Sequence, residues 1–315
     1  MYYIGLDIGG TKCAATLGKA TESLPIIQDK EYFLTAGQNP TVILEKFSAF
    51  IEKHLKDKQI QGIGISCGGP LDSKRGIIMR PPSLPLWDDI HIVEYFENKF
   101  NIKTYLQNDA NACAVAEWKF GAGKGSDNVV FLTFGTGFGA GLILDGKLYS
   151  GQNDNAGEIG HVRLTASGPL GYYKHGSCEG YCSGSGIARL ALIIAKQKRY
   201  KDSFEEYKKA VGDEISAKTI AEHARLGNEF CKAVYRKSGI MLGRTLSILV
   251  DVINPQKIVI GGVYMRSHDL LYPHAIKVMK KECLSYSLSV VEVLPAGLSE
   301  NIGDYAALAL AIGDY

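Results

Sequence analysis

Two stretches of this 315-residue chain, residues 4–18 and residues 130–146, share one design. Each reads as an apolar strand, a turn rich in Gly and Thr, and a second apolar strand: "IGLDIGGTKCAATLG" and "VFLTFGTGFGAGLILDG". Two copies of one hairpin predict two related lobes that face each other. The length agrees, because a single hydrophobic core usually stops growing at about 250–300 residues. The break is expected at residues 120–128, where Gly, Lys and Ser follow a helical segment.

Apolar runs of strand length alternate with helical patterns along the rest of the chain. Helices are predicted at residues 40–57 and 109–121. Strands are predicted at residues 2–8, 60–66, 103–107, 128–134, 140–146, 257–262 and 289–294. Alternation of this kind predicts layered α/β sheets.

Composition and charge exclude several classes of partner. The chain is 46% hydrophobic and 22% charged with a formal net charge of +2, and it has no Lys/Arg run that would indicate a nucleic-acid or membrane surface. Its seven Cys are odd in number and scattered, which indicates reduced thiols rather than a disulfide framework. No apolar run reaches membrane-spanning length, and the N-terminus lacks the pattern of a signal peptide. We therefore expect a cytoplasmic protein without a nucleic-acid or membrane partner.

The two Gly-rich turns carry the first chemical signal. Glycines permit positive φ and close approach of a backbone, and successive N–H groups form a concavity for anions; they are Gly9, Gly10, Gly135, Gly137, Gly139 and Gly141. Thr11 and Thr136 add hydroxyls, and Lys12 adds a charge. Neither turn matches a Walker A loop or a dinucleotide fingerprint. A single turn of this kind is most often structural, but the matched pair, with Asp7 beside the first, favours phosphate binding with Asp7 near a divalent ion.

Two further clusters offer groups that bind hydroxyls. Asn108 and Asp109 lie where a predicted strand meets the start of a predicted helix, so Asp109 is either the N-cap of that helix or a functional carboxylate. Glu158 and His161 are three residues apart, a spacing that directs both side chains to one face of a helical turn. Carboxylates, Asn and His are the side chains that recognise a polyol.

Six motifs occur in the order and spacing of one known family: "LDIGGTK", "SCGGPLDSKRG", "QNDANACAVAEW", "FGTGFGAG", "GEIGH" and "VIGGV". Almost from end to end, the chain resembles the ROK family of repressors, uncharacterised reading frames and sugar kinases. The resemblance implies an α/β, actin-like ATPase fold in which two ribonuclease-H-like lobes bind ATP and sugar in a central cleft. It gives an N-terminal lobe of residues 1–120, joined by a C-terminal helix at 301–315, and a C-terminal lobe of residues 121–300. It also implies a homodimer.

The same resemblance assigns roles to individual residues. Asp109 takes the proton from the attacking sugar hydroxyl. The other sugar contacts are Gly68, Gly69, Asn108, Glu158, His161 and Glu179. ATP is held through two groups: Asp7, Gly9, Gly10, Thr11, Lys12, Gly135, Thr136 and Gly137 at the phosphates, and Gly261 and Gly262 along the adenosine. Mg²⁺ is organised by Asp7 through water.

The chain departs from the family at its zinc motif, Cys-x-Cys-Gly-x-x-Gly-Cys-x-Glu. Leu170, Tyr172 and Ser177 stand at the three cysteine positions, and Cys178 stands at a spacer position. A structural zinc needs four ligands, so we expect none here. We expect apolar packing by Leu170, Tyr172 and Tyr173 to replace the metal.

A second departure is "PPSLPLW", where family members often have Asn-Leu-Pro-Gly-Trp. Ser83 and Leu86 therefore change a segment near the expected sugar cleft. The DNA-binding domain that precedes the first phosphate loop in the repressor branch is not expected, because the first strand begins at once.

The sequence thus predicts an ATP-dependent kinase of a free hexose or N-acetylhexosamine. A sugar sensor of the same family with weak catalysis is the alternative, disfavoured because both Asp7 and Asp109 are present. A chaperone-like or filament-forming ATPase of the same fold is a third possibility, disfavoured because the set of sugar contacts is complete.

Overall fold

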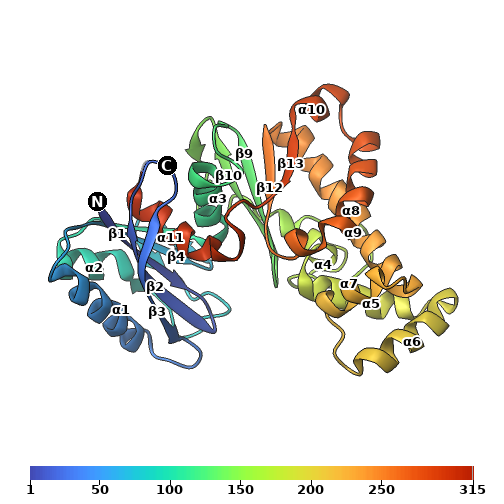
Figure 1. Cartoon of the computed structure of the whole chain (residues 1–315), viewed down its shortest axis with the longest axis horizontal. Helices are drawn as coiled ribbons and strands as arrows, with labels where there is room; N and C mark the ends of the chain where they lie inside the picture. Colours follow the sequence, from blue (N-terminus) through green and yellow to red (C-terminus); the bar gives the residue numbers. More distant parts are fainter. Residues whose placement is uncertain (314) are drawn as a thin grey trace. The chain divides into compact units, whose positions relative to one another are not determined.

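The computed structural model describes residues 1–313 and 315, without the side chain of Glu300. The chain divides into two compact units. Unit 1 comprises Met1–Phe131, Gly141–Ala156 and Gly297–Tyr315, and unit 2 comprises Leu132–Ala140 and Gly157–Ala296 (Figure 1). These units do not coincide with the lobes predicted from the sequence, since residues 141–156 group with unit 1. The lobe boundary near residue 120 stays a prediction.

The first sheet belongs to unit 1 and has the strand order β3-β2-β1-β4-β8. Its strands are β1 (Tyr2–Ile8), β2 (Lys12–Lys19), β3 (Ile26–Leu34), β4 (Ile60–Cys67) and β8 (Thr104–Asn108). The first three strands are antiparallel neighbours, whereas β4 runs parallel to β1 and β8 parallel to β4. The predictions at residues 2–8, 60–66 and 103–107 are confirmed.

Alternation along β1 and β4 separates the two faces of this sheet. Ile4, Leu6 and Ile8 enter a buried core together with side chains of α1 (Pro40–Leu55) and α2 (Ile92–Phe100). The helices α1 and α2 lie on that face, and α11 (Ile302–Ile312) packs on the other (Figure 1). The helix α1 confirms the prediction at residues 40–57, and the helix-breaking Pro40 stands at its start, where a proline is tolerated.

Small residues let α11 approach the sheet closely. A Cβ added at Gly64 would lie 2.1 Å from the carbonyl oxygen of Ala307 and 2.4 Å from the amide nitrogen of Ala311. The chain reaches α11 after a segment that is held by Glu117, a buried carboxylate on α3 (Asp109–Phe120). Glu117 accepts hydrogen bonds from the amides of Gly297 and Leu298, at 3.0 and 2.9 Å. The glycines and Glu117 thus fix the position of α11 within unit 1.

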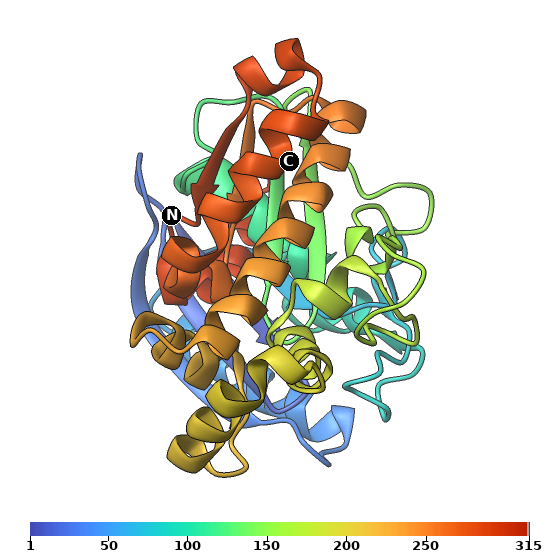
Figure 2. The same ribbon diagram turned by 90° about the vertical axis from the view of Figure 1, so that its right-hand side faces the viewer.

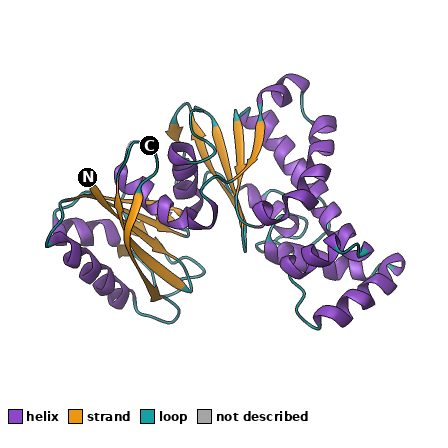
Figure 3. Ribbon diagram, viewed as in Figure 1, coloured by secondary structure: helices purple, strands orange, loops and turns teal. Residues whose placement is uncertain are grey.

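A second five-stranded sheet, whose strands like those of the first are orange in Figure 3, repeats the order of the first as β11-β10-β9-β12-β13. Its strands are β9 (Val129–Phe134), β10 (Phe138–Leu144), β11 (Lys147–Leu148), β12 (Lys257–Ile260) and β13 (Glu292–Pro295). In each sheet a hairpin from one Gly-rich segment forms the first two strands, so the prediction of two related halves is confirmed at the level of topology. The strand predicted at 289–294 is partly wrong, because residues 285–290 form α10 (Ser285–Val290) and only the residues from Glu292 onward pair with β12.

Helices make up most of unit 2. The long helix α8 (Glu229–Ile253) lies beside α9 (Val263–Glu282) (Figure 2). The remaining helices are α4 (Cys178–Tyr181), α5 (Gly184–Ala195), α6 (Lys201–Val211) and α7 (Ala217–Arg225), with 3-10 turns η1 (Ile159–His161) and η2 (Lys198–Tyr200). The helices α4, α5, α6 and α7 all contact α8, which is therefore the centre of this layer.

Short elements complete the chain. A small antiparallel sheet in unit 1 contains β5 (Leu71–Asp72), β6 (Ile77–Ile78) and β7 (Ile90–His91), and the 3-10 turn η3 (Ser299–Asn301) precedes α11. None of the described helices is both long and apolar enough to cross a membrane.

Candidate active site

Three parallel strands of unit 1 end side by side. Ile8, Cys67 and Asn108 are register partners at the ends of β1, β4 and β8. Polar groups gather at this edge because Asp7 precedes the end of β1, while Gly68 and Asp109 follow the ends of the other two. The sequence-predicted residues Asp7, Gly68, Gly69, Asn108 and Asp109 are thus brought together.

Asp7 lies on the face of β1 that meets α11, since Gly303 of that helix is its neighbour. The pKa of its carboxyl group is raised to about 6, first by burial and then by the negative charges of Asp109 and Asp304. A hydrogen bond from Ser66 and the charge of Lys30 partly oppose this rise. Three carboxylates therefore share one region of unit 1, and burial together with this like charge disfavours the ionised form of Asp7.

Asp304 already has a cationic partner. Its carboxylate binds the ammonium of Lys30 at 2.5 Å and accepts from the hydroxyl of Thr16 at 3.3 Å. The excess negative charge is therefore carried by Asp7 and Asp109. Such a pair of carboxylates is suited to a divalent cation held through water, because the cation neutralises their repulsion.

Asn108, not Asp109, is the N-cap of α3. The side-chain oxygen of Asn108 accepts from the amide of Ala110 at 2.9 Å, and the carboxylate of Asp109, in the first turn, accepts from the same amide at 2.8 Å. The interpretation of Asp109 as the cap is wrong. Its side chain keeps access to solvent, but surrounding protein atoms remove part of its hydration and raise its pKa. A carboxyl group with a raised pKa is a better proton acceptor than an ordinary aspartate.

The glycine pair after β4 lines the same edge. A Cβ at Gly69 would lie 3.5 Å from the amide nitrogen of the Asn108 side chain, and the peptide bond between Gly69 and Pro70 is cis. Nothing lies within 4 Å of the corresponding point at Gly68. The backbone at Gly68 is thus open on the side where a side chain would otherwise project.

The first Gly-rich turn joins β1 to β2. The amide of Gly9 donates to the carbonyl oxygen of Lys12 at 3.2 Å, and the side chains of Thr11 and Lys12 are exposed. A Cβ at Gly10 would lie 2.6 Å from the Cβ of Ser83. Ser83 therefore packs directly on this turn, a contact that the sequence did not predict, whereas Leu86 is exposed.

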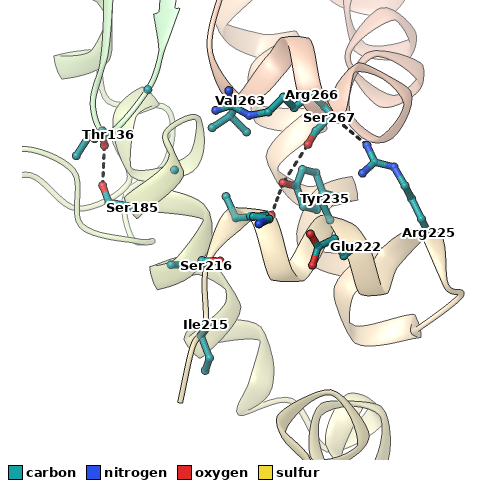
Figure 4. A pocket seen from close by; sticks show the side chains of 16 residues that line it. Thr136, Ser185, Ile215, Ser216, Glu222, Arg225, Tyr235, Val263, Arg266 and Ser267 are labelled. Carbon is teal, nitrogen blue, oxygen red and sulfur yellow. Dashed lines mark hydrogen bonds between the residues drawn. The ribbon is translucent and has the colours of Figure 1, made fainter. Parts of the chain in front are cut away.

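The second Gly-rich turn, in unit 2, is anchored to the start of α5. The amide of Gly184 donates to the carbonyl oxygen of Gly135 at 2.8 Å, and the hydroxyl of Ser185 donates to the carbonyl oxygen of Thr136 at 2.8 Å (Figure 4). Of the six turn glycines predicted from the sequence, none adopts a positive φ. Of the two properties that glycine permits, the structure uses close approach at Gly10, where the Cβ of Ser83 leaves no room for a side chain.

A cavity of about 840 Å³ in unit 2 opens beside this turn (Figure 4). Its lining includes Gly135, Thr136 and Val263, the last being the first residue of α9. Gly261 and Gly262 precede Val263; the amide of Gly261 donates to the carbonyl oxygen of Leu132 at 3.0 Å, and Gly262 has a φ of +66°. The two glycines thus end β12 and turn the chain into the helix that borders the cavity.

The far wall of the cavity comes from residues of α7, α8 and α9 that lie outside the motifs found in the sequence. Arg225 of α7 forms two hydrogen bonds to Asp269, at 2.7 and 2.9 Å. Ser267 donates to the phenolic oxygen of Tyr235 at 3.3 Å, and Tyr235 donates to the carbonyl oxygen of Ala217 at 2.8 Å (Figure 4). These bonds hold the three helices around a preformed space.

The other predicted sugar contacts also belong to unit 2. Glu158 immediately precedes η1, His161 ends it, and both side chains are exposed. Glu179 lies on α4, and one of its carboxylate oxygens accepts from the amide of Phe138 at 3.2 Å. Glu179 is thus bound to the end of the second Gly-rich turn.

The cysteine-containing segment is stabilised differently from the expectation. Leu170, Tyr172 and Tyr173 are 39%, 53% and 86% exposed, so the predicted apolar packing by these residues is wrong. Cys178 and Cys182 are instead fully buried. The two thiols lie against α8: Thr245 donates to the sulfur of Cys178 at 3.3 Å, and Cys182 lies 4.0 Å from the carbonyl oxygen of Ser238.

Backbone contacts complete this segment. Residues 164 and 165 both donate to the carbonyl oxygen of Gly176, and the hydroxyl of Ser177 caps α4 by accepting from Gly180 at 3.3 Å. Among the described side chains no group of three or more His, Cys, Asp or Glu is arranged to hold a metal ion directly. The absence of zinc stays a prediction, tested below.

Comparisons with known proteins agree with the geometry. The profile of the ROK family matches residues 3–314. A glucokinase of Streptomyces coelicolor is 31% identical over 98% of this chain and 96% of its own length. A xylose repressor of Bacillus spizizenii is 26% identical over 95% of this chain and 74% of its own length. The crystal structure of a ROK family glucokinase from Streptomyces griseus in complex with glucose and AMPPNP superposes with a TM-score of 0.78 and 28% identity, covering 99% of each chain.

Proposed function

The chain belongs to the ROK family and is an ATP-dependent carbohydrate kinase with the actin-like ATPase fold, and we propose that it phosphorylates a hydroxyl group of a free hexose or N-acetylhexosamine. The family and the fold predicted from the sequence are confirmed. The individual site residues and the identity of the sugar belong to the proposal. The observation that carries it is the strand edge of unit 1, where Asp7 and Asp109 lie together and both have raised pKa values.

We assign Asp109 as the general base. Its carboxylate is solvent-accessible at the start of α3 and is not needed as the helix cap, because Asn108 fills that role. The raised pKa makes it a stronger proton acceptor for the attacking hydroxyl group. Asn108 keeps its side-chain NH₂ group for a neighbouring sugar hydroxyl, since only its oxygen is used by the cap.

The remaining sugar contacts are assigned by their chemistry. The open backbone at Gly68 gives a sugar ring room to approach, and Gly69 adjoins the side-chain NH₂ group of Asn108. Glu158, His161 and Glu179 offer the acceptors and donors that recognise paired hydroxyls. The bond from Phe138 orients the carboxylate of Glu179 and leaves its other oxygen for the sugar.

The nucleotide is assigned to two groups of residues. The turn at Gly9, Gly10, Thr11 and Lys12 in unit 1 and the turn at Gly135, Thr136 and Gly137 in unit 2 offer amides, hydroxyls and one cation to phosphates. The cavity beside the second turn is large enough for an adenosine group, since ligand pockets span roughly 300–1,000 Å³. Gly261 and Gly262 shape its entrance through Val263.

Asp7 is the residue that would organise Mg²⁺, through water. When bound, Mg²⁺ and ATP supply charge neutralisation and the transferable phosphoryl group. The chain itself binds the phosphates on backbone amides, orients the sugar hydroxyl and accepts its proton at the Asp109 carboxylate. A homodimer remains part of the proposal because of the family resemblance. A cytoplasmic location and a division into lobes at residue 120 remain part of it because of the sequence pattern.

A sugar-binding regulator is the second candidate, because a xylose repressor is among the relatives. A regulator needs the sugar contacts but neither a metal-organising carboxylate nor a base. The presence of both Asp7 and Asp109, with raised pKa values, favours the kinase.

An ADP-release assay over hexoses and N-acetylhexosamines tests the proposal. We expect sugar-dependent ADP release with Mg²⁺ present, strongest for one sugar of the panel. Calorimetry with the same sugars supplies the comparison. A sugar that binds but causes no ADP release above the sugar-free rate would favour the regulator.

A further inference from the structure

A second cavity, of about 550 Å³, lies in unit 2 apart from the proposed nucleotide and sugar residues. Its floor is apolar: Leu190 and Ile194 of α5 and Ala233 of α8 are buried, and Ile240 of α8 continues the surface. A cavity of this size is in the range of pockets that hold small organic molecules.

Three cations and two tyrosines surround this floor. Arg199 follows α5, whereas Arg236 and Lys237 are neighbours on α8. The guanidinium of Arg236 donates to the hydroxyl of Tyr200 at 3.1 Å, and that of Arg199 lies 4.7 Å from the centre of the Tyr200 ring. These contacts hold both guanidinium groups at the rim while leaving most of their five N–H donors unused.

None of the three cations at this rim forms an ion pair within the described part of the chain. No Asp or Glu lines the cavity, and within the described part of the chain no carboxylate lies within 4.0 Å of Arg199, Arg236 or Lys237. Burial, followed by the charge of Arg244, lowers the pKa of Lys237, as expected for an ammonium group without a counter-ion. Three like charges gathered around one cavity attract an anion to it.

The walls are preformed. The hydroxyl of Tyr181 lies 2.9 Å from that of Thr165 and 3.3 Å from the carbonyl oxygen of Ser167, which fixes the tyrosine ring against the loop at 167–169. Arg199 also donates to Gln197 at 3.0 Å. A ligand would therefore meet a fixed surface and lose little free energy in ordering it.

We propose that this cavity is a binding site for a small organic anion with an apolar body. The carboxylate, sulfonate or phosphate group of the ligand binds at Arg236 and Lys237, with Arg199 adding charge, while an aromatic or branched aliphatic body lies on Leu190, Ile194 and Ile240. Purely hydrophilic anions, such as inorganic phosphate, have no apolar group to pack on these side chains and therefore bind weakly.

The fluorescent anion 8-anilinonaphthalene-1-sulfonate has this chemistry and serves as the probe. Titrations use the full chain without AMPPNP and with saturating AMPPNP, which is expected to occupy the other cavity. We expect one bound probe per chain and weaker binding as the salt concentration rises. Arg236→Gln and Lys237→Gln should each weaken binding roughly tenfold, as expected for a hydrogen bond to a charged group.

Lys232→Gln is the matched control, because Lys232 lies on the same helix, carries the same charge and pairs with Glu229 outside this cavity. It should leave the affinity for the probe unchanged. The proposal is overturned if the unmodified chain does not bind the probe, if AMPPNP displaces it, or if all three variants bind equally. Circular dichroism of each variant shows whether a loss of binding comes from unfolding, and Arg199→Gln replaces any variant that fails this check.

Discussion

The carboxyl group of Asp7 makes folding depend on pH in a defined direction. Its pKa rises from 3.8 to about 6 in the folded chain, so the folded state holds this proton more tightly than the unfolded state. The ionised group therefore opposes folding, fully above pH 6 and not at all below pH 3.8. The ionised carboxylate of Asp7 therefore lowers the stability of the ligand-free protein, and a bound cation would offset this effect.

Asp7→Asn should stabilise the ligand-free protein at pH 8. The substitution removes the buried charge and its repulsion with Asp109, and we expect a gain in the free energy of unfolding of about 1–3 kcal/mol. The gain should shrink as the pH falls toward 4. Thermal unfolding of both proteins at pH 8 and pH 4.5, without metal or nucleotide, measures it. A loss of stability at pH 8 would show that Asp7 does not carry an uncompensated charge.

Glu158→Ala and Glu179→Ala should each weaken sugar binding by about one to two decades, because each removes a charged hydrogen-bond partner. Nucleotide binding should change much less. Glu179→Gln is the control, since its amide oxygen can still accept from Phe138 while the charge is lost. Separate calorimetric titrations of sugar and AMPPNP provide the test, and equal losses for both ligands would indicate a folding defect.

For single residues, the sequence correctly placed Asn108 and Asp109 at the junction of a strand and a helix, because an apolar strand followed by polar residues is a recognisable sequence pattern. Only Asp109 was considered as the cap and Asn108 was missed, because the two residues are adjacent and both side chains accept from Ala110. Ser83 was recognised as a departure from the family but not as a contact of Gly10, because the two are 73 positions apart in the chain and no periodicity connects them.

The packing of α11 on the first sheet depends on a glycine in β4, Gly64, which has no side chain to hold the helix away. Gly64→Ala should destabilise the protein by about 3 kcal/mol, since the added methyl group would overlap the backbone of α11, which cannot move without disturbing the whole face. Gly68→Ala is the control at the end of the same strand, because nothing lies within 4 Å of its Cβ position. Denaturant unfolding of both variants compares them. Similar stabilities would show that α11 is not closely packed at Gly64.

The segment around Cys178 and Cys182 should fold without zinc. Its thiols are buried against α8, and burial raises the pKa of Cys178 to about 11, so it remains a neutral thiol. Protein expressed in zinc-supplemented medium should contain far less than one zinc per chain by elemental analysis, and chelation followed by restored Mg²⁺ should leave activity intact. Cys178→Ser should change turnover little. One zinc per chain, with activity lost on chelation, would contradict this account.

Strands and amphipathic helices were predictable where the apolar pattern fitted only one type of secondary structure. The run at 289–294 was ambiguous, because its first residues complete a helical turn and only the later ones find a strand partner in β12. The walls of the larger cavity were not predictable. They come from α7, α8 and α9, whose inward side chains are ordinary Ser, Tyr and Arg residues that become neighbours only through helix packing.

The molecule as a whole contains two five-stranded sheets of the same order, and each begins with a Gly-rich hairpin. The repeated sequence pattern predicted this topology because a hairpin is a local structure. The division of the chain into units was harder to predict from the sequence. It depends on contacts between segments that are distant in the chain, such as those that group residues 297–315 with unit 1. The chemistry follows from the topology, because parallel strands that end together place Asp7 and Asp109 at one edge.

The central claim, phosphoryl transfer to a sugar hydroxyl with Asp109 as the base, is tested most directly by Asp109→Asn. The measurement is the rate of sugar phosphate formation, followed by mass spectrometry, together with calorimetric binding of the same sugar. We expect one sugar phosphate per ADP in the unmodified protein and, in the variant, a kcat lower by roughly 10²–10⁴ with nearly unchanged sugar affinity. Stability should be kept, because Asn108 caps the helix. A near-normal kcat in the variant, or sugar binding without sugar phosphate in the unmodified protein, would contradict the claim.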